Sequence, residues 1–407
     1  MIKFLFPRDW RRYVDGSRGM LINDFANWVV SRGYSRTCAK RHVRRLREVL
    51  TSTRIKIGPG EPISPAMLAR CFAPWAGDSV YRGTHVAARR FLEAHCLLIS
   101  RVERKPFDSL IATYRSYLID QRGFSPSTVG HHLQTVGRFL ESTRSREHSL
   151  ARLSRGDVER FVDRTSGHLT RQSLQHTVAH LRSFLRFCSN RGLTGGGLDI
   201  IDTPRAYRGE LPPRALPWSL VRKLLSSVDR SSIEGCRDHT ILYLMAYYGL
   251  RPSEVASLTV DSISWDNRTL RVEQCKTRSV AIFPLDDRAT RVLSRYLRCR
   301  PDGPWRELFL KIRCPAGPIK AATIGDIYDN RARRSGLPIV GSSSYSLRHS
   351  FAMRLLERGV GVKAIGDLLG HHSFESTCVY LRLHTDALRG VALPLPRRRH
   401  LAVEAAL

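Results

Sequence analysis

The sequence is short of acidic residues. Its 407 residues include 36 Asp and Glu against 67 Lys and Arg, which leaves a formal net charge of +31. The basic excess is spread along the chain and is not collected in one tail. This charge exceeds what solubility requires, so it indicates a polyanionic partner. A basic protein that merely adheres to anions is the alternative.

Long hydrophobic runs are also lacking. The longest, Ile241 to Tyr248, is far below the roughly 20 residues that span a bilayer. The opening residues MIKFLFPRDWRR carry charge where a signal peptide would have its apolar core and cleavage site. We therefore expect neither a membrane nor a secreted protein. The overall composition, 42% hydrophobic and 25% charged, is that of a globular chain.

Paired cysteines and metal-binding clusters are missing as well. The nine cysteines are an odd number, are scattered, and form no CxxC. Cys236 and His239 make half of a possible zinc pair, but no second half follows. The glycines at 195–197 are not followed by the Gly-Lys-Ser/Thr of a phosphate loop. We therefore expect reduced thiols, no metal and no cofactor.

The chain contains an internal repeat. Residues 27–54 align with residues 117–144 at a shift of 90 residues. At the same shift, residues 63–72 are similar to residues 153–162. The aligned identical pairs include Arg32 with Arg122, Gly33 with Gly123, Ser35 with Ser125, His42 with His132 and Leu50 with Leu140. Each copy is expected to be one helical module.

Both copies predict the same helix–turn–helix. One helix ends at Gly33 or Gly123 in the left-handed conformation, and Ser35 or Ser125 caps the next. In the first copy that next helix has a basic face, which includes Lys40, Arg41, Arg44, Arg45 and Arg47. These residues are candidates for phosphate contacts, and a merely solvated face is the alternative.

A Gly- and Pro-rich stretch then separates the repeat from a region of different pattern. We expect five parts: modules at 1–103 and 104–195, a linker at 196–216, a mixed α/β domain at 217–390, and a tail at 391–407. In the fourth part we expect helices at 218–229, 237–248, from Pro252, and near 287–299, 321–335, 345–358 and 361–369. Strands at 270–275 and 279–285 would form a hairpin.

Four segments of this region carry candidate chemistry. They are YYGLRPSEVASL (247–258), VEQCKTRSVAIFPL (272–285), SYSLRHSFAMRLLERG (344–359) and LLGHHSFESTCVYLRL (368–383). In this order they resemble the tyrosine recombinase, or phage integrase, family over about residues 105–390. The resemblance implies a mainly α fold with a small antiparallel β-sheet. Tandem helical, SAM-like DNA-binding modules would precede a mixed α/β catalytic domain.

Two arginines are expected to hold the phosphate. Arg251 precedes Pro252 at the first position of a helix, where anions are favoured, and Arg348 lies near the start of another helix. Two guanidinium forks on one phosphate can neutralise its non-bridging oxygens. The resemblance implies that Lys276, at the hairpin tip, protonates the departing 5′ oxygen, and Arg278 is its competitor.

The last motif supplies a nucleophile. The resemblance implies that Tyr380 attacks a DNA phosphodiester and leaves a 3′-phosphotyrosine. It also implies a role for His371, nine residues earlier, in donating to the phosphate or shuttling the tyrosine proton; His372 is an alternative with the wrong spacing. We expect the positive cluster to favour the phenolate form of Tyr380 as its proton leaves.

One position departs from the family pattern. The family commonly has histidine three residues before the second arginine, where this chain has Tyr345. A phenol can donate a hydrogen bond to a phosphate but carries no positive charge. We therefore assign Tyr345 a supporting role in phosphate binding. His349, directly after Arg348, is left without a role.

The resemblance implies a site-specific recombinase, of integrase or transposase type, that uses no ATP or metal. Its partners would be double-stranded DNA with specific recombination sites and three further copies in a tetramer, with the tail docking on a neighbour. It would act in the bacterial cytoplasm, associated with the nucleoid. The alternatives are a type IB topoisomerase-like enzyme and a non-catalytic DNA-binding protein on the same fold.

Overall fold

The computed structural model describes residues 1–14, 18–53, 62–98, 107–143, 150–203, 214–274, 279–314, 316–371 and 373–383. These residues group into two units, one from the ranges Met1–Leu98 and Leu211–Leu407 and one from Ile99–Glu210. Within the described residues, no helix is long and apolar enough to cross a membrane. The same residues contain no cluster of three or more potential metal ligands.

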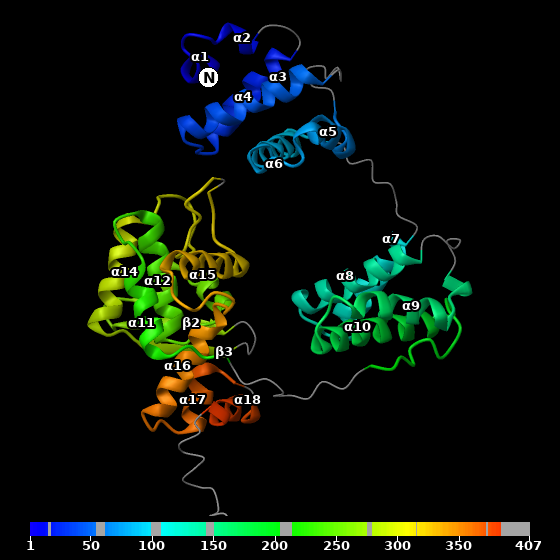
Figure 1. The fold of residues 1–407 in the computed structure, drawn as a ribbon, viewed down its shortest axis with the longest axis vertical. Coiled ribbons are helices and arrows are strands. Elements are labelled where there is room, and N and C mark those ends of the chain that lie inside the picture. The colour runs from blue at the N-terminus through cyan, green and yellow to red at the C-terminus, as the bar shows by residue number, and fades with distance from the viewer. Residues whose placement is uncertain are drawn as a thin grey trace, which may run out of the picture. The chain divides into compact units, whose positions relative to one another are not determined.

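The described residues of the first helical module form six α-helices (blue in Figure 1). They are α1 (Ile2–Leu5), α2 (Arg11–Val14), α3 (Gly19–Ser31), α4 (Arg36–Ser52), α5 (Pro65–Phe72) and α6 (Ser79–Ala94), with the 3-10 turn η1 (Ala73–Trp75) after α5. Their apolar faces enclose one core in which Phe25, Val43 and Phe91 are completely or almost completely buried. Burial of such side chains contributes about 1.5–3 kcal/mol each.

The second module has its own core. Its helices are α7 (Asp108–Ser116), α8 (Pro126–Ser142), α9 (Arg155–Ser166) and α10 (Arg171–Ser189), with a π-helical turn η2 (Tyr117–Gln121) after α7 and the 3-10 turn η3 (Leu150–Arg152) before α9. Tyr114, Phe139 and Phe184 are fully buried there. Figure 1 shows this group in cyan to green.

The structure confirms the repeated turn chemistry. Gly33 and Gly123 have φ of 80° and 61°, in the left-handed region. The Ser35 hydroxyl accepts the Cys38 N–H at 3.3 Å, and the Ser125 hydroxyl accepts the Thr128 N–H at the same distance. The paired histidines are buried in both copies, His42 against Thr84 and His132 against Tyr114.

The remaining part is mainly helical. It contains α11 (Trp218–Ser227), α12 (Ile233–Tyr247), α13 (Pro252–Ser257), α14 (Asp287–Cys299), α15 (Ala321–Ser335), α16 (Tyr345–Glu357), α17 (Val362–Leu369) and α18 (Glu375–Cys378). The 3-10 turns are η4 (Val260–Ser262) and η5 (Val379–Leu383). Helix α12 is buried over most of its length and packs against α14 and α16. Figure 1 draws this region in green to red.

A small sheet lies beside these helices. Strands β1 (Ile263–Ser264), β2 (Thr269–Gln274) and β3 (Ser279–Pro284) form an antiparallel sheet in sequence order. In β2, Leu270, Val272 and Gln274 alternate as buried residues, so one face meets the core. The predicted hairpin and the mainly α fold class are therefore confirmed. The short strand β1 was not predicted, and α12 begins at Ile233, ahead of the predicted residue 237.

Candidate active site

A buried arginine, Arg348, and a half-buried one, Arg251, share the buried carboxylate of Glu254. Arg251 immediately precedes α13, and Pro252 occupies the first helical position as predicted. The Arg251 backbone N–H donates to Glu254 Oε2 at 2.8 Å, and its Nη1 donates to Oε1 at 2.5 Å. Arg348, in α16, places its Nη1 3.7 Å from the same Oε2. Glu254 thus brings two guanidinium groups together from segments far apart in sequence.

Backbone carbonyls fix the orientation of Arg348. Its Nη1 donates to the Gly249 carbonyl and its Nη2 to the Leu369 carbonyl. Each acceptor lies in a turn where a glycine packs closely against another segment. A Cβ on Gly249 would lie 2.5 Å from Phe351, and a Cβ on Gly370, the residue after Leu369, would lie 1.8 Å from Gln274 Oε1. Both glycines also have positive φ. The two turns therefore require glycine for the arginine to be held as it is.

The charge of Arg348 survives its burial. Burial, and secondly the neighbouring Arg251, lower the pKa of Arg348 to about 10, although Glu254 opposes the shift. The side chain therefore remains protonated at neutral pH. A desolvated guanidinium of this kind interacts with an anion more strongly than one in water.

Tyr380 reaches the same place from η5. It is only 4% exposed and packs with Ala352, Met353, Ile365 and Leu369. Its hydroxyl lies 3.1 Å from His349 Nδ1, one residue after Arg348. With the imidazole proton on Nε2, the phenol donates this hydrogen bond to Nδ1.

The pKa of Tyr380 is the net result of opposing effects. Burial raises it, whereas the positive charges of Arg348 and Arg251 lower it, and burial dominates. The expected preference for phenolate is thus outweighed in the structure without DNA. Burial and then Arg348 lower the pKa of His349, so this imidazole is neutral at pH 7 and able to accept a proton.

His371 lies beside Tyr380 at the end of α17. The two rings are nearly parallel, at 14°, with centroids 6.3 Å apart. His371 Nδ1 is 2.8 Å from Thr377 Oγ1, and its backbone N–H donates to the Gly366 carbonyl. These bonds fix the ring next to the phenol.

The hairpin tip lies outside the described residues. Lys276 and its competitor Arg278 belong to this tip. His372 and the tail at 391–407 also lie outside the described residues. The last residue of β2 is described, and it reaches the site: Gln274 is buried and contacts the Gly370 turn, whose carbonyl accepts Arg251 Nη2 at 3.3 Å. The strand that leads to Lys276 therefore ends at the arginine pair.

Comparison with known proteins agrees with these observations. Residues 216–386 match the phage integrase family, and residues 111–192 match the phage integrase N-terminal SAM-like domain. The chain is 30% identical over 395 residues to the putative integrase/recombinase y4rA of Sinorhizobium fredii, covering 94% of this chain and 95% of that protein.

The chain belongs to the phage integrase family of tyrosine recombinases. It is also 30% identical over 294 residues to the tyrosine recombinase XerD of Listeria monocytogenes, which covers 69% of this chain and 96% of XerD. The y4rA match covers so much of the chain that it must include much of the first module, whereas the XerD match leaves about a third of the chain unmatched.

Solved structures share the fold of this tyrosine recombinase. The XerH site-specific recombinase bound to a palindromic difH substrate, in a post-cleavage complex, superposes with a TM-score of 0.55 at 17% identity. It covers 74% of this chain and 93% of XerH. A lambda integrase dimer bound to a COC′ core site gives 0.53 at 17% identity, covering 78% and 91%.

The remaining predicted residues of the recombinase are more exposed. Tyr345, the first residue of α16, is 48% exposed and so faces solvent at the edge of the site. On α4, Arg41 and Arg44 are exposed. Lys40 and Arg45 are half-buried, lying over Phe6 and Tyr81, respectively, so they also pack within the module.

Sequence reasoning missed two residues of this site. Glu254 has no assigned role until its contacts with both arginines are seen, although a glutamate three residues after Arg251 at a helix start is a capping signal. His349 was left open because its partner is Tyr380, 31 residues away. The only local signal was its position one residue after Arg348.

Proposed function

We propose that this recombinase cuts and rejoins DNA strands through Tyr380, without ATP or metal. The Tyr380 oxygen forms a bond to a DNA phosphorus as the bond from phosphorus to the 5′ oxygen breaks, leaving a 3′-phosphotyrosine. The observation that carries this proposal is the 3.1 Å hydrogen bond between Tyr380 and neutral His349, beside buried Arg348 and half-buried Arg251. Resealing by a different strand's 5′-hydroxyl would complete recombination.

We assign the proton movements to residues that the geometry favours. His349 Nδ1 accepts the phenol proton, because burial keeps the phenol neutral until a base takes that proton. Lys276 gives a proton to the leaving 5′ oxygen, and the contact of Gln274 with Gly370 supports its delivery to the site. His371 donates to a phosphate oxygen.

The two arginines stabilise the charge that develops on the phosphate. Their forks would contact its non-bridging oxygens, and each contact is worth roughly 3 kcal/mol of transition-state stabilisation by comparison with single-donor losses elsewhere. Shared Glu254 holds both groups before DNA arrives, so little reorganisation is needed at the moment of reaction.

The test is formation of a covalent protein–DNA adduct. Nicked duplexes tiled across the DNA that flanks the gene are incubated with the full chain, and adducts are detected on denaturing gels. We expect an adduct with the wild type and with Tyr117→Phe, a matched loss of one hydroxyl elsewhere, and none with Tyr380→Phe. An adduct that persists in Tyr380→Phe would refute the assignment. Relaxation of a plasmid that lacks the sites would instead indicate a topoisomerase.

We further propose specific paired sites, a tetramer, and action at the nucleoid in the bacterial cytoplasm. The domains would be 1–103, 104–195 and 217–390, joined by the linker at 196–216 and followed by the tail at 391–407. The separate apolar cores of the two modules support this division, and the bacterial sources of the relatives support the location. Crosslinking on paired sites tests the tetramer.

The first module is proposed to contact DNA through α4. Its exposed Arg41 and Arg44 have no carboxylate partner among the described residues, which leaves them available for phosphates. The pair Arg41→Gln and Arg44→Gln should reduce the salt-dependence slope of DNA binding by about 2, because each phosphate contact contributes about 0.9. The exposed pair Arg70→Gln and Arg82→Gln is the control, and an unchanged slope for the α4 pair would assign α4 to protein contacts.

A further inference from the structure

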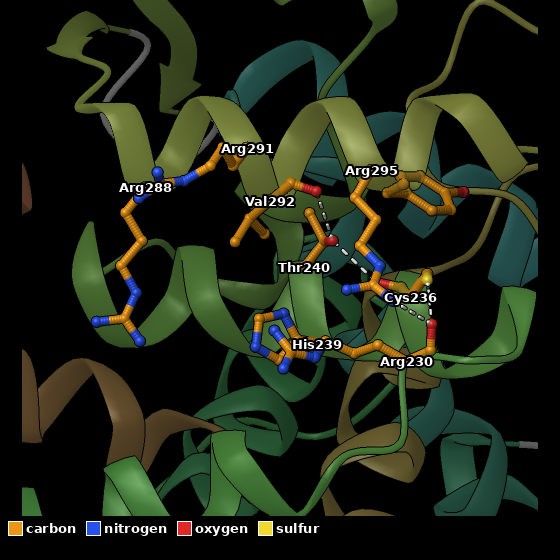
Figure 2. A pocket seen from close by; sticks show the side chains of 9 residues that line it. Arg230, Cys236, His239, Thr240, Arg288, Arg291, Val292 and Arg295 are labelled. Atoms are coloured by element: carbon orange, nitrogen blue, oxygen red, sulfur yellow. Dashed lines mark hydrogen bonds between the residues drawn. The ribbon is translucent and has the colours of Figure 1, made fainter.

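A second group of arginines surrounds a hollow between α12 and α14. The hollow has a volume of about 320 Å³. Figure 2 shows Arg288, Arg291 and Arg295 on α14, with His239 and Thr240 on α12 facing them. Arg230, from the segment before α12, extends beneath His239. The active site uses none of these residues.

The three arginines of α14 share one face of the helix. Positions 288, 291 and 295 are three and four residues apart, so their side chains are neighbours. Like charges at this spacing repel one another. Across the described ranges, none of the four arginines around the hollow forms an ion pair with a carboxylate. Within the described residues no contact ion pair therefore neutralises these guanidinium groups, and the more distant carboxylate of Asp229 interacts favourably with one of them, Arg295.

The hollow has a buried polar floor. His239 is 6% exposed, and neither of its ring nitrogens has a hydrogen-bond partner among the residues described. Burial first, and then Arg230, Arg288 and Arg295, lower the pKa of His239 to about 4, so it is neutral at pH 7. A neutral imidazole beneath several guanidinium groups offers one N–H donor to a ligand in the hollow.

Two arginines are already held in place. Arg295 Nη2 donates to the Arg230 carbonyl at 3.1 Å, which ties α14 to the segment before α12. The Arg288 guanidinium stacks over Tyr247, 5.2 Å from the ring centroid. These contacts position the two groups at the rim, but most of their N–H donors have no acceptor among the residues that the structure describes.

We propose that this hollow is a second anion site that binds a phosphate group. The N–H groups of a guanidinium match the oxygens of a phosphate in geometry. Four guanidinium groups offer more N–H donors than the two oxygens of a carboxylate can accept, which favours a phosphate as the ligand. The volume lies at the lower end of the range for small-ligand pockets, about 300–1,000 Å³, which leaves room for a diphosphate. The phosphate could belong to a small molecule or to the DNA backbone.

The site is distinct from the catalytic one. His239 and Thr240 face α14 from the middle of α12, whereas Arg251 and Gly249 follow the end of that helix. Phosphate binding at the hollow therefore does not depend on Tyr380 or on strand cleavage. A failure of either proposal leaves the other standing.

The experiment follows the imidazoles of the full chain by NMR during titration with pyrophosphate at constant ionic strength. His239→Gln assigns the His239 resonance, and His371, assigned in the same way, reports on the active site. We expect the His239 signal to shift and saturate. Arg291→Gln should weaken that binding about tenfold or more, because a charge-assisted fork is lost, and Arg291→Lys should weaken it less.

A control variant and a competition with duplex DNA complete the experiment. Arg298→Gln makes the same change on an exposed position of α14 outside the hollow and should leave the affinity unaltered. If duplex DNA displaces pyrophosphate at His239, the natural ligand is a backbone phosphate, and if it does not, the ligand is a small phosphate compound. A His239 signal that does not shift, or equal affinities for wild type and Arg291→Gln, would overturn the proposal.

Discussion

The two arginine clusters of this recombinase differ in how their charge is balanced. Arg348 is buried and Arg251 is half-buried, and Glu254 together with backbone carbonyls accepts hydrogen bonds from some of their N–H groups. The arginines around the hollow are exposed at its rim and have no carboxylate partner among the residues described. Both clusters suit phosphate, but by different means.

The two clusters differ in whether their guanidinium groups are oriented before the ligand binds. In the active site the fold fixes the guanidinium groups before any DNA arrives, which favours stabilisation of a transition state. At the hollow the arginines repel one another, and the proposed anion would supply their counter-charge on binding. The first arrangement is suited to catalysis and the second to reversible binding. Substitutions at four positions of the proposed active site test its side of this comparison, beginning with the largest expected effect.

Replacing Glu254 with Gln should make the active-site pair resemble the hollow. The change leaves buried Arg348 and half-buried Arg251 without their shared counter-charge, and loss of the partner of a buried charge typically costs about 3–5 kcal/mol. Urea unfolding measures the loss. Asp261→Asn, which breaks the exposed pair with Arg306, should cost at most about 1 kcal/mol. Similar losses for both variants would contradict the importance assigned to Glu254.

Replacing Arg348 with Lys keeps the charge but removes the fork. One ammonium cannot reach the Gly249 and Leu369 carbonyls and two phosphate oxygens together. We expect adduct formation to slow by about 10²-fold, because the loss of one positioned hydrogen-bond donor typically has an effect of this size. Arg298→Lys, with its side chain exposed on α14, is the matched control. A wild-type rate for Arg348→Lys would mean that charge alone suffices there.

Replacing His349 with Gln removes the proton acceptor but not the hydrogen-bonding capacity. Loss of a general base typically costs about 10²-fold or more in rate. Because the pKa of His349 is lowered, the wild type should stay active somewhat below pH 6.5 and lose activity as the pH falls through this lowered value. The variant should lack that acid limb of the pH–rate profile. If the pH–rate profile of His349→Gln were unchanged, His371 would be the better candidate for the base that accepts the Tyr380 proton.

The smallest effect is expected at Tyr345. Its exposure limits the gain from one hydrogen bond to about 1 kcal/mol, so Tyr345→Phe should slow cleavage only a few-fold. Tyr345→His adds a cationic donor as the pH falls and should be faster at acid pH than the wild type. Cleavage rates on a nicked substrate compare the three proteins. Equal rates throughout would make the position a bystander.

Much of the fold could be predicted because its signals are local. Serine caps at 35 and 125, glycines at 33 and 123, and alternation in β2 each depend on neighbouring residues. Strand β1 has two residues, too few for any periodicity. The early start of α12 at Ile233 depends on the Ser232 cap, which lies in a polar stretch that resembles a loop.

The site was less predictable where partners are distant. The resemblance supplied Arg251, Arg348 and Tyr380, and the structure brings them together with His371. It could not show that Glu254 joins both arginines or that His349 meets Tyr380, because those contacts exist only after folding. The spacing of arginines on α14 is visible in the sequence, but Arg230 and His239 reach the hollow only through helix packing.

The missing side chain at position 370 allows the end of β2 to lie against a turn of the proposed active site. Since Gln274 occupies the space a methyl group would need, the end of β2 cannot shift toward this turn without pressing on it. The same turn supplies the carbonyls that hold Arg251 and Arg348. We therefore expect that a DNA strand which moves the end of β2 would also shift the two carbonyls that orient Arg251 and Arg348.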